Sequence, residues 1–164
     1  MATPVRILID GSNVIHAWPE LRALLPARKD EARSRLVERV RALHEAGTDE
    51  VIVVFDGRGE SMSVTSQGAD PAVLVVYTAA GQTADTVIEQ FVGRAPHPEN
   101  CRVVTADRAE RQTVEALGAV VLPPEDLAAW IDRAERRVGS KLERRRAEND
   151  QKWRGKGKGE GKSE

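Results

Sequence analysis

Aspartates recur in this sequence where short apolar runs end. Four of them stand just after such a run or in the first turn of the helix expected after it, namely Asp10, Asp56, Asp85 and Asp107. Carboxylates brought within a few ångströms of one another repel, so a cluster of them is costly unless a cation neutralises it. Oxygen ligands without cysteine or paired histidines are typical of Mg²⁺ or Mn²⁺ sites. A cation held in this way activates water and stabilises charge on a phosphate, which predicts phosphodiester hydrolysis.

Each of these aspartates also has a structural explanation. The Asp-Gly pairs at positions 10 and 56 are common in turns, and the other two aspartates stand where an acid stabilises a helix N-terminus. For any one residue alone the structural explanation is the better one, but the joint placement of all four favours a site. Asn13 adds an amide close to Asp10, where it orients that carboxylate or a substrate oxygen or, alternatively, caps the helix that follows.

An alternation of strands and helices must position these residues. Short apolar runs rich in β-branched residues predict strands at Val5 to Ile9, Val51 to Phe55, Val73 to Tyr77, Arg102 to Thr105 and Val120 to Leu122. Helices are predicted at about Asp30 to Glu45, Ala84 to Gly93 and Arg108 to Leu117, with a short one after Asn13. This order predicts a single α/β domain, with a mainly parallel sheet flanked by helices on both faces. The carboxyl ends of its strands would then share one edge, where ligands bind.

Two segments depart from this alternation. The polar, glycine-containing stretch 57–72 is long for a connection inside a compact domain and indicates a functional flap or a mobile loop. A last helix is predicted to begin near Glu125 and to continue as a charged helix towards Asn149, with a disordered lysine- and glycine-rich end beyond Trp153. We therefore divide the chain into a folded domain, 1–132, and a charged extension, 133–164.

Composition restricts the classes of protein that remain. A chain of 164 residues has the size of one domain, and its single cysteine, Cys101, allows neither an internal disulfide nor a thiolate zinc cluster. The N-terminus lacks the pattern of a signal peptide, and no run approaches the length of a membrane span. These features predict a cytoplasmic protein without a membrane partner.

Charge is distributed unevenly along the chain. From Arg133 to the end there are 12 lysines and arginines against 6 aspartates and glutamates, whereas the remaining 132 residues carry 13 against 20. A basic extension on an acidic body predicts contact with a polyanion, and a solvated charged terminus is the alternative. The candidate RNA-binding residues in this extension are Arg136, Arg137, Lys141, Arg144 and Arg145.

Four segments together resemble the YacP-like branch of the NYN domains, which are relatives of the PIN nucleases. They are Asp10-Gly-Ser-Asn13-Val-Ile-His16, Val-Val-Phe-Asp56, Gly81-Gln82-Thr83-Ala84-Asp85 and Val-Val-Thr105-Ala106-Asp107-Arg108, and the likeness extends over roughly residues 5–132. The resemblance implies a PIN-like fold and a metal-dependent endoribonuclease that uses Mg²⁺ or Mn²⁺. It implies catalytic roles and metal ligation for Asp10, Asp85 and Asp107, with Asn13 assisting and Asp56 as a fourth member.

The resemblance also leaves alternatives. Gln82 stands where relatives often carry an acid, so the fourth acidic ligand is Asp56, Glu89 or Glu110, with Glu89 expected at the surface. Arg108 either receives the scissile phosphate or pairs with Asp107. RNA is the expected partner, and mRNA at the ribosome is one form in which the protein would meet it. The rival function is a non-catalytic RNA- or ribosome-binding module that keeps the fold.

Overall fold

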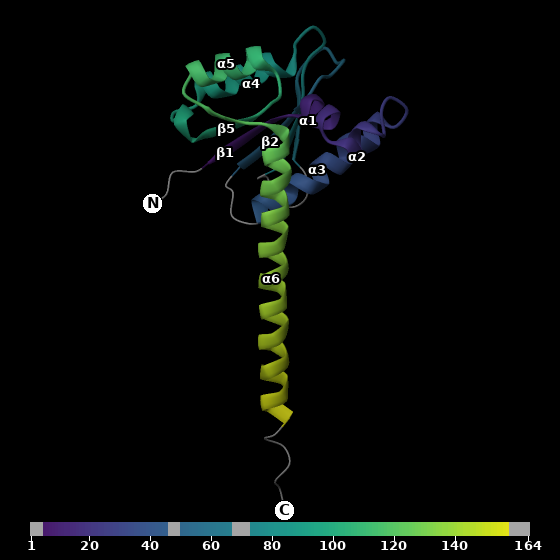
Figure 1. Cartoon of the computed structure of the whole chain (residues 1–164), viewed down its shortest axis with the longest axis vertical. Coiled ribbons are helices and arrows are strands. Elements are labelled where there is room, and N and C mark those ends of the chain that lie inside the picture. Colours follow the sequence, from purple (N-terminus) through teal and green to yellow (C-terminus); the bar gives the residue numbers. More distant parts are fainter. Residues whose placement is uncertain (1–4, 46–49, 67–72, 158–164) are drawn as a thin grey trace, which may run out of the picture.

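Five apolar segments lie side by side as parallel strands at the centre of the molecule (Figure 1). The computed structural model describes residues 5–45, 50–66 and 73–157. The parallel strands are β1 (Arg6–Asp10), β2 (Glu50–Phe55), β4 (Val73–Tyr77), β5 (Cys101–Val104) and β6 (Val120–Leu122). A sixth strand, β3 (Ser63–Ser66), pairs antiparallel with β4, and the order across the sheet is β3-β4-β2-β1-β5-β6. The predicted mainly parallel α/β fold is confirmed.

Strand β3 is the element that the sequence did not predict. All four of its residues are exposed, and it pairs only with β4 at the edge of the sheet. A strand of this kind needs no apolar run, so the hydrophobic pattern that predicts buried strands cannot find it. It lies within the stretch 57–72 that we expected to be a flap or mobile loop, of which residues 67–72 are outside the described part of the chain.

Helices cover both faces of the sheet. One face carries α1 (Gly11–Ala17), α2 (Pro19–Arg22), α3 (Lys29–Glu45) and the first part of α6 (Pro124–Gly157), and the other carries α4 (Ala84–Arg94) and α5 (Arg108–Ala116). A short 3₁₀ helix, η1 (Pro98–Asn100), precedes β5. Among the described elements, the short helices α2 and η1 were, like β3, not predicted, because segments of three or four residues carry too little periodicity.

Alternation along the strands decides which way the strand-end residues face. Ile7 and Ile9 of β1 belong to the core beneath α3 and α6, whereas Leu8 belongs to the core beneath α4 and α5. Side chains two residues apart on a strand point to the same face. Asp10 therefore continues the row of Leu8 and faces the layer formed by α4 and α5.

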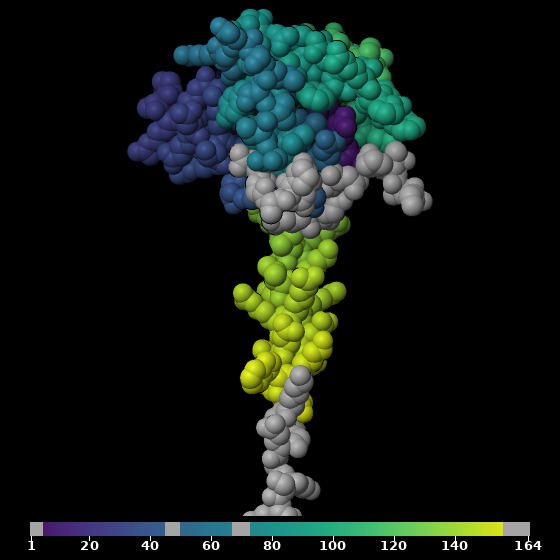
Figure 2. Space-filling view, turned by 180° about the vertical axis from the view of Figure 1, so that it is seen from behind, coloured from purple at the N-terminus to yellow at the C-terminus, as the bar shows by residue number. Residues whose placement is uncertain are grey.

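Helix α6 begins inside the domain and ends far outside it. Ile131 and Ala134 are buried, but from Glu135 onward almost every residue is exposed, including Trp153, and the distal part of the helix projects away from the body (Figures 1 and 2). The described helix continues past Trp153 to Gly157, within the segment that we expected to be disordered. The predicted boundary between residues 132 and 133 falls inside this one helix, and residues 158–164 are outside the description.

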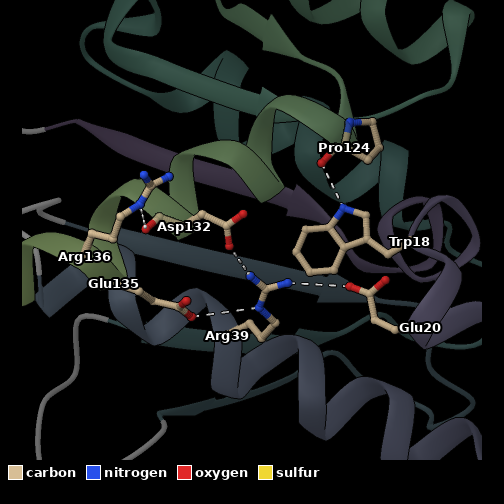
Figure 3. A network of polar contacts seen from close by, with 7 residues as sticks. All are labelled: Trp18, Glu20, Arg39, Pro124, Asp132, Glu135 and Arg136. Carbon is tan, nitrogen blue, oxygen red and sulfur yellow. Dashed lines mark hydrogen bonds and ion pairs between the residues drawn. The ribbon is translucent and has the colours of Figure 1, made fainter. Parts of the chain in front are cut away.

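A polar network holds the start of α6 against the domain (Figure 3). The indole nitrogen of buried Trp18 donates a hydrogen bond to the carbonyl oxygen of Pro124 at 2.9 Å. Arg39 lies over the Trp18 ring and pairs with Asp132 at 2.9 Å. Trp18 thus anchors the turn before α2 to the core and to the start of α6. No helix of the described residues is long and apolar enough to cross a bilayer.

Candidate active site

Asp10 stands at the junction between β1 and α1. It is the N-cap of α1, accepting a hydrogen bond from the backbone amide of Asn13 on Oδ1 at 3.3 Å, and it is only 4% exposed. The helix begins so close to the sheet that a Cβ atom at Gly11 would overlap the Phe55 ring. The Asp-Gly sequence suits this junction, because aspartate caps the helix and glycine allows the start of α1 to approach the Phe55 ring closely.

Asn13 connects the ends of two neighbouring strands. Its Nδ2 donates to Oδ2 of Asp10 at 2.9 Å, and its Oδ1 accepts a hydrogen bond from the backbone amide of Ala106 at 3.2 Å. The predicted alternative, in which Asn13 caps the helix, is not found. Its side chain orients the Asp10 carboxylate, while the cap of α1 is Asp10 itself.

Glu110 reaches the same place from α5. It is 1% exposed, and its Oε2 accepts a hydrogen bond at 2.7 Å from the hydroxyl of Thr105, which follows β5. The other oxygen, Oε1, is buried and has no hydrogen-bond partner among the described residues. Two carboxylates can only accept hydrogen bonds, so beside Asp10 this atom needs a shared proton or a cation.

The protonation of this pair reflects its surroundings. Burial raises the pKa of Glu110 to about 9, and the hydrogen bond to Asp10 that the protonated carboxyl can form, the charge of Asp10 and the charge of Asp85 raise it further. Burial also raises the pKa of Asp10, and the charge of Asp56 adds to this increase. Four acids thus act on one another electrostatically at the carboxyl edge of the sheet. A pair of neighbouring acids with raised pKa values, such as Asp10 and Glu110, is typical of a functional site.

Asp56, which follows β2, contacts the start of α4, where Asp85 lies. Oδ1 of Asp56 accepts a hydrogen bond at 3.0 Å from the backbone amide of Ala84, so the residue after β2 is fixed to the first turn of α4. Buried Thr78 supports the loop, because its hydroxyl accepts from the amide of Gly57 at 3.1 Å. Asp85 is half-buried in the first turn of α4, and its charge contributes to the raised pKa of Glu110.

Asp107 is the N-cap of α5. Its Oδ1 accepts hydrogen bonds from the amides of Ala109 and Glu110 at 2.8 and 3.1 Å, which leaves Oδ2 without a described partner. As the side chains stand, no group of three or more histidine, cysteine, aspartate or glutamate residues within the described ranges is arranged to hold a metal ion. That Asp10, Asp85 and Asp107 share a cation therefore stays a prediction.

The donor set nevertheless fits a hard divalent cation. The ligands that meet at this edge are carboxylates, and one of their oxygens, Oε1 of Glu110, is buried without a donor. A cation would replace the proton that the raised pKa values indicate and would satisfy that oxygen. Asp10, Asp85 and Glu110, with Oδ2 of Asp107, are the groups that can hold it.

The remaining candidates lie at the surface. His16 and Arg108 are exposed, and Arg108 forms no ion pair with any described residue, so the predicted alternative of a pair with Asp107 is not found. Glu89, which we expected at the surface, is half-buried on α4 and makes no described hydrogen bond. The sequence did not single out Lys29, Arg33 or Arg58, which line a groove beside Asp56. Of these three residues, only Arg58 stands close in the sequence to a predicted site residue, since it follows Asp56-Gly57.

Fold and site together define an α/β domain with acids at the carboxyl edge of a mainly parallel sheet. The model of the YacP-like NYN domain matches residues 7–160, and the chain belongs to this family. NYN domains are part of the PIN-like nuclease superfamily, whose members generally use divalent metal ions. This membership supports a nuclease-type, RNA-related function.

Relatives of known structure agree with this assignment. The chain is 29% identical over 133 residues to the uncharacterized protein YacP of Bacillus subtilis (strain 168), which covers 80% of this chain and 78% of the relative. It is also similar to the crystal structure of Rae1 (YacP) from Bacillus subtilis, with a TM-score of 0.72, 26% identity and coverage of 90% and 84% of the two chains. A mutant of the same protein gives a TM-score of 0.69 at 27% identity, covering 88% and 85%.

Proposed function

We propose that this protein is an endoribonuclease that hydrolyses single-stranded RNA with Mg²⁺ or Mn²⁺. The observation that carries the proposal is the buried carboxyl of Glu110, which has one oxygen without a donor beside Asp10. Burying two carboxyls that repel each other is costly, and a folded protein keeps such a pair where a ligand or a reaction uses it. Membership in the NYN family supplies RNA as the expected substrate.

Each residue of the site then has a role. Asp10, Asp85 and Asp107 would hold the cation as metal ligands, with Glu110 as the fourth acid. Asn13 orients the Asp10 carboxylate, and the Thr105 hydroxyl orients Glu110. Asp56 fixes the start of α4 and lowers the local potential. When bound, the cation would activate a water molecule and stabilise charge on the phosphate under attack.

The test is cleavage of an end-labelled single-stranded RNA by the full-length protein. Internal cuts are expected with Mg²⁺ or Mn²⁺ and none with EDTA, because the acids alone offer no positive charge to the phosphate. Cleavage that continues in EDTA would refute the metal mechanism. An RNA that is bound but never cut with either cation would instead favour the non-catalytic binding module, for which the helix-capping role of Asp107 and the neutral Gln82 are the supporting features.

The charged helix leads to a separate prediction about affinity. The basic residues of its distal part are exposed and have no acidic partner among the described residues; they are Arg137, Lys141, Arg144 and Arg145, together with Arg136, which donates to the Asp132 carbonyl. Replacing all five with glutamine should weaken binding of a long RNA and reduce the slope of log K against log salt by about 3.5, since each phosphate contact contributes roughly 0.7. Filter binding at several salt concentrations measures this slope.

The position of the helix supplies the control for that experiment. With a rise of about 1.5 Å per residue, Lys141 lies roughly 25 Å along the axis from the start of α6 at Pro124. A tetranucleotide bound at the carboxylates is too short to reach it, so the glutamine variant should cut a tetranucleotide at the normal rate. Glu143→Gln, in the same part of the helix, should strengthen binding of the long RNA. Equal slopes for the variant and the unmodified protein would leave the helix without a role in RNA contact.

A further inference from the structure

A groove of about 510 Å³ lies beside Asp56, over the carboxyl ends of β2 and β4. Its walls come from the start of α3, the loop after β2, the start of β3 and the end of β4. The side chains that matter for its chemistry are Lys29, Arg33, Asp56, Arg58, Ser61 and Tyr77. A volume of this size is within the range of sites that bind small ligands or part of a polymer.

The groove gathers positive charge on an acidic body. Its three cations come from two separate segments, and none of them pairs with a carboxylate within the described ranges. The other arginines of α3, by contrast, are all paired with an acid: Arg35, Arg39 and Arg41. Asp30 and Asp56 are the negative groups that face the groove. The three cations are therefore available to an anion that enters it.

Arg33 is held in place by contacts that do not consume its charge. Its guanidinium lies 5.2 Å from the centre of the Phe55 ring and 5.5 Å from that of Tyr77, and Nη2 donates to the backbone carbonyl of Asp56 at 3.1 Å. No other donor of Arg33 has a partner among the described residues. A guanidinium fixed in this way loses little entropy when it binds a phosphate, and its planar fork suits phosphate oxygens.

Asp56 connects this groove to the carboxylates. It lines the groove, and its Oδ1 accepts a hydrogen bond from the amide of Ala84, the residue before Asp85. Its charge also raises the pKa of Asp10. An RNA strand bound in the groove would thus lead from Lys29, Arg33 and Arg58 directly to the carboxylates of the candidate active site.

We propose that this groove binds the phosphate backbone of single-stranded RNA next to the bond that is cut, with Arg33 as a fixed anchor and with Lys29 and Arg58 as flexible contacts. The inference rests on the proposed function and names how the substrate is held. An acidic body should repel RNA, so unpaired cations beside the site give the strand a defined route to it. Lys29 and Arg58 are exposed, and they add charge without a fixed geometry.

The experiment measures binding and cleavage separately. Binding of a short single-stranded RNA in EDTA is followed by fluorescence anisotropy at several salt concentrations, with full-length protein. Replacing Lys29, Arg33 and Arg58 with glutamine should weaken binding at least tenfold at low salt and reduce the salt slope by about 2, at roughly 0.7 for each phosphate. In the presence of cation, the same variant should show a raised KM for cleavage.

Two further variants guard against a loss of folding. Arg33 contacts two aromatic rings, whereas Lys29 and Arg58 make no described hydrogen bond or ion pair. A variant with glutamine at Lys29 and Arg58 alone should therefore keep the fold, and its salt slope should be smaller by about 1.4. Arg33→Lys keeps the charge but loses the planar fork, and should raise KM without changing the slope. Arg94→Gln, an exposed arginine at the end of α4, is the matched control and should bind as the unmodified protein does.

The outcomes separate this inference from the nuclease proposal. If the triple variant has unchanged affinity for RNA and an unchanged salt slope, the proposal that this groove binds RNA is wrong, whatever the cleavage assay gives. An equal loss with Arg94→Gln overturns it too, because the effect would then be one of net charge alone. If the unmodified protein cuts no RNA with any cation but the triple variant loses binding, the groove is supported as an RNA site and the nuclease proposal fails.

Discussion

Asp85→Asn should reduce RNA cleavage by about 10²–10³-fold while leaving the fold intact, since the change removes a full charge from the cation site and preserves volume. Asp85 makes no described side-chain hydrogen bond, so the amide breaks none. Asp10→Asn should have at least as large an effect on cleavage, but it also replaces an oxygen that accepts from Asn13. Rates at saturating RNA and thermal unfolding of the same samples separate the loss of chemistry from the loss of stability.

Two comparisons make this result specific. Asp150→Asn changes the same charge on an exposed residue of α6 and should cut RNA normally. Asp107→Asn retains the N-cap, because asparagine caps helices as well as aspartate does. It should therefore lower cleavage only if Oδ2 of Asp107 binds the cation. Full activity of the Asp85→Asn and Asp10→Asn proteins would contradict the assignment of the site.

Much of the arrangement followed from the hydrophobic pattern. The parallel strands are buried on both faces, so they appear in the sequence as unbroken apolar runs, and the residues after them had to share one edge. That reasoning placed Asp10 and Asp56 correctly at strand ends. It could not assign the roles of Asp107, because an aspartate before a helix looks the same whether it caps the helix or binds an ion.

The fourth acid was left open for a physical reason. Glu89 lies in the middle of α4 and Glu110 in the first turn of α5, and both helices pack on the same face of the sheet. Only the rotation of each helix on the sheet decides which carboxyl points inward. In the structure Glu110 is buried and Glu89 is partly exposed. The groove could not be predicted from the sequence, because Arg33 lies 23 positions before the Asp56 carbonyl that it contacts. Local sequence patterns do not indicate contacts between residues so far apart in the chain.

Glu110→Gln should stabilise the metal-free protein at neutral and alkaline pH. In the folded protein Glu110 has a pKa of about 9, against 4.5 for an ordinary glutamate. Between these two values the folded state holds a proton that the unfolded state has released, so stability falls as pH rises through this window, by up to about 1.4 kcal/mol per pH unit. Glutamine stays neutral, mimics the protonated acid and can donate to Asp10.

The two proteins should therefore have similar free energies of unfolding near pH 5 and differ by about 2 kcal/mol or more at pH 8, the variant being the more stable. Urea unfolding in EDTA at several pH values measures this difference. Asp10 keeps its raised pKa in the variant, so a smaller slope of the same sign should remain. Glu115→Gln, on the exposed side of α5, breaks only the ion pair with Arg111 and should shift the curve by a few tenths of a kcal/mol at all pH values.

Addition of Mn²⁺ should reverse the order of stability. In the unmodified protein the cation takes the place of the proton on Glu110, so Mn²⁺ should raise the free energy of unfolding most at high pH and release a proton on binding. The Glu110→Gln protein has lost that ligand, so Mn²⁺ should stabilise it less and RNA cleavage should fall by about 10²-fold. Parallel pH profiles for the two proteins in EDTA would contradict the raised pKa of Glu110 on which this prediction rests.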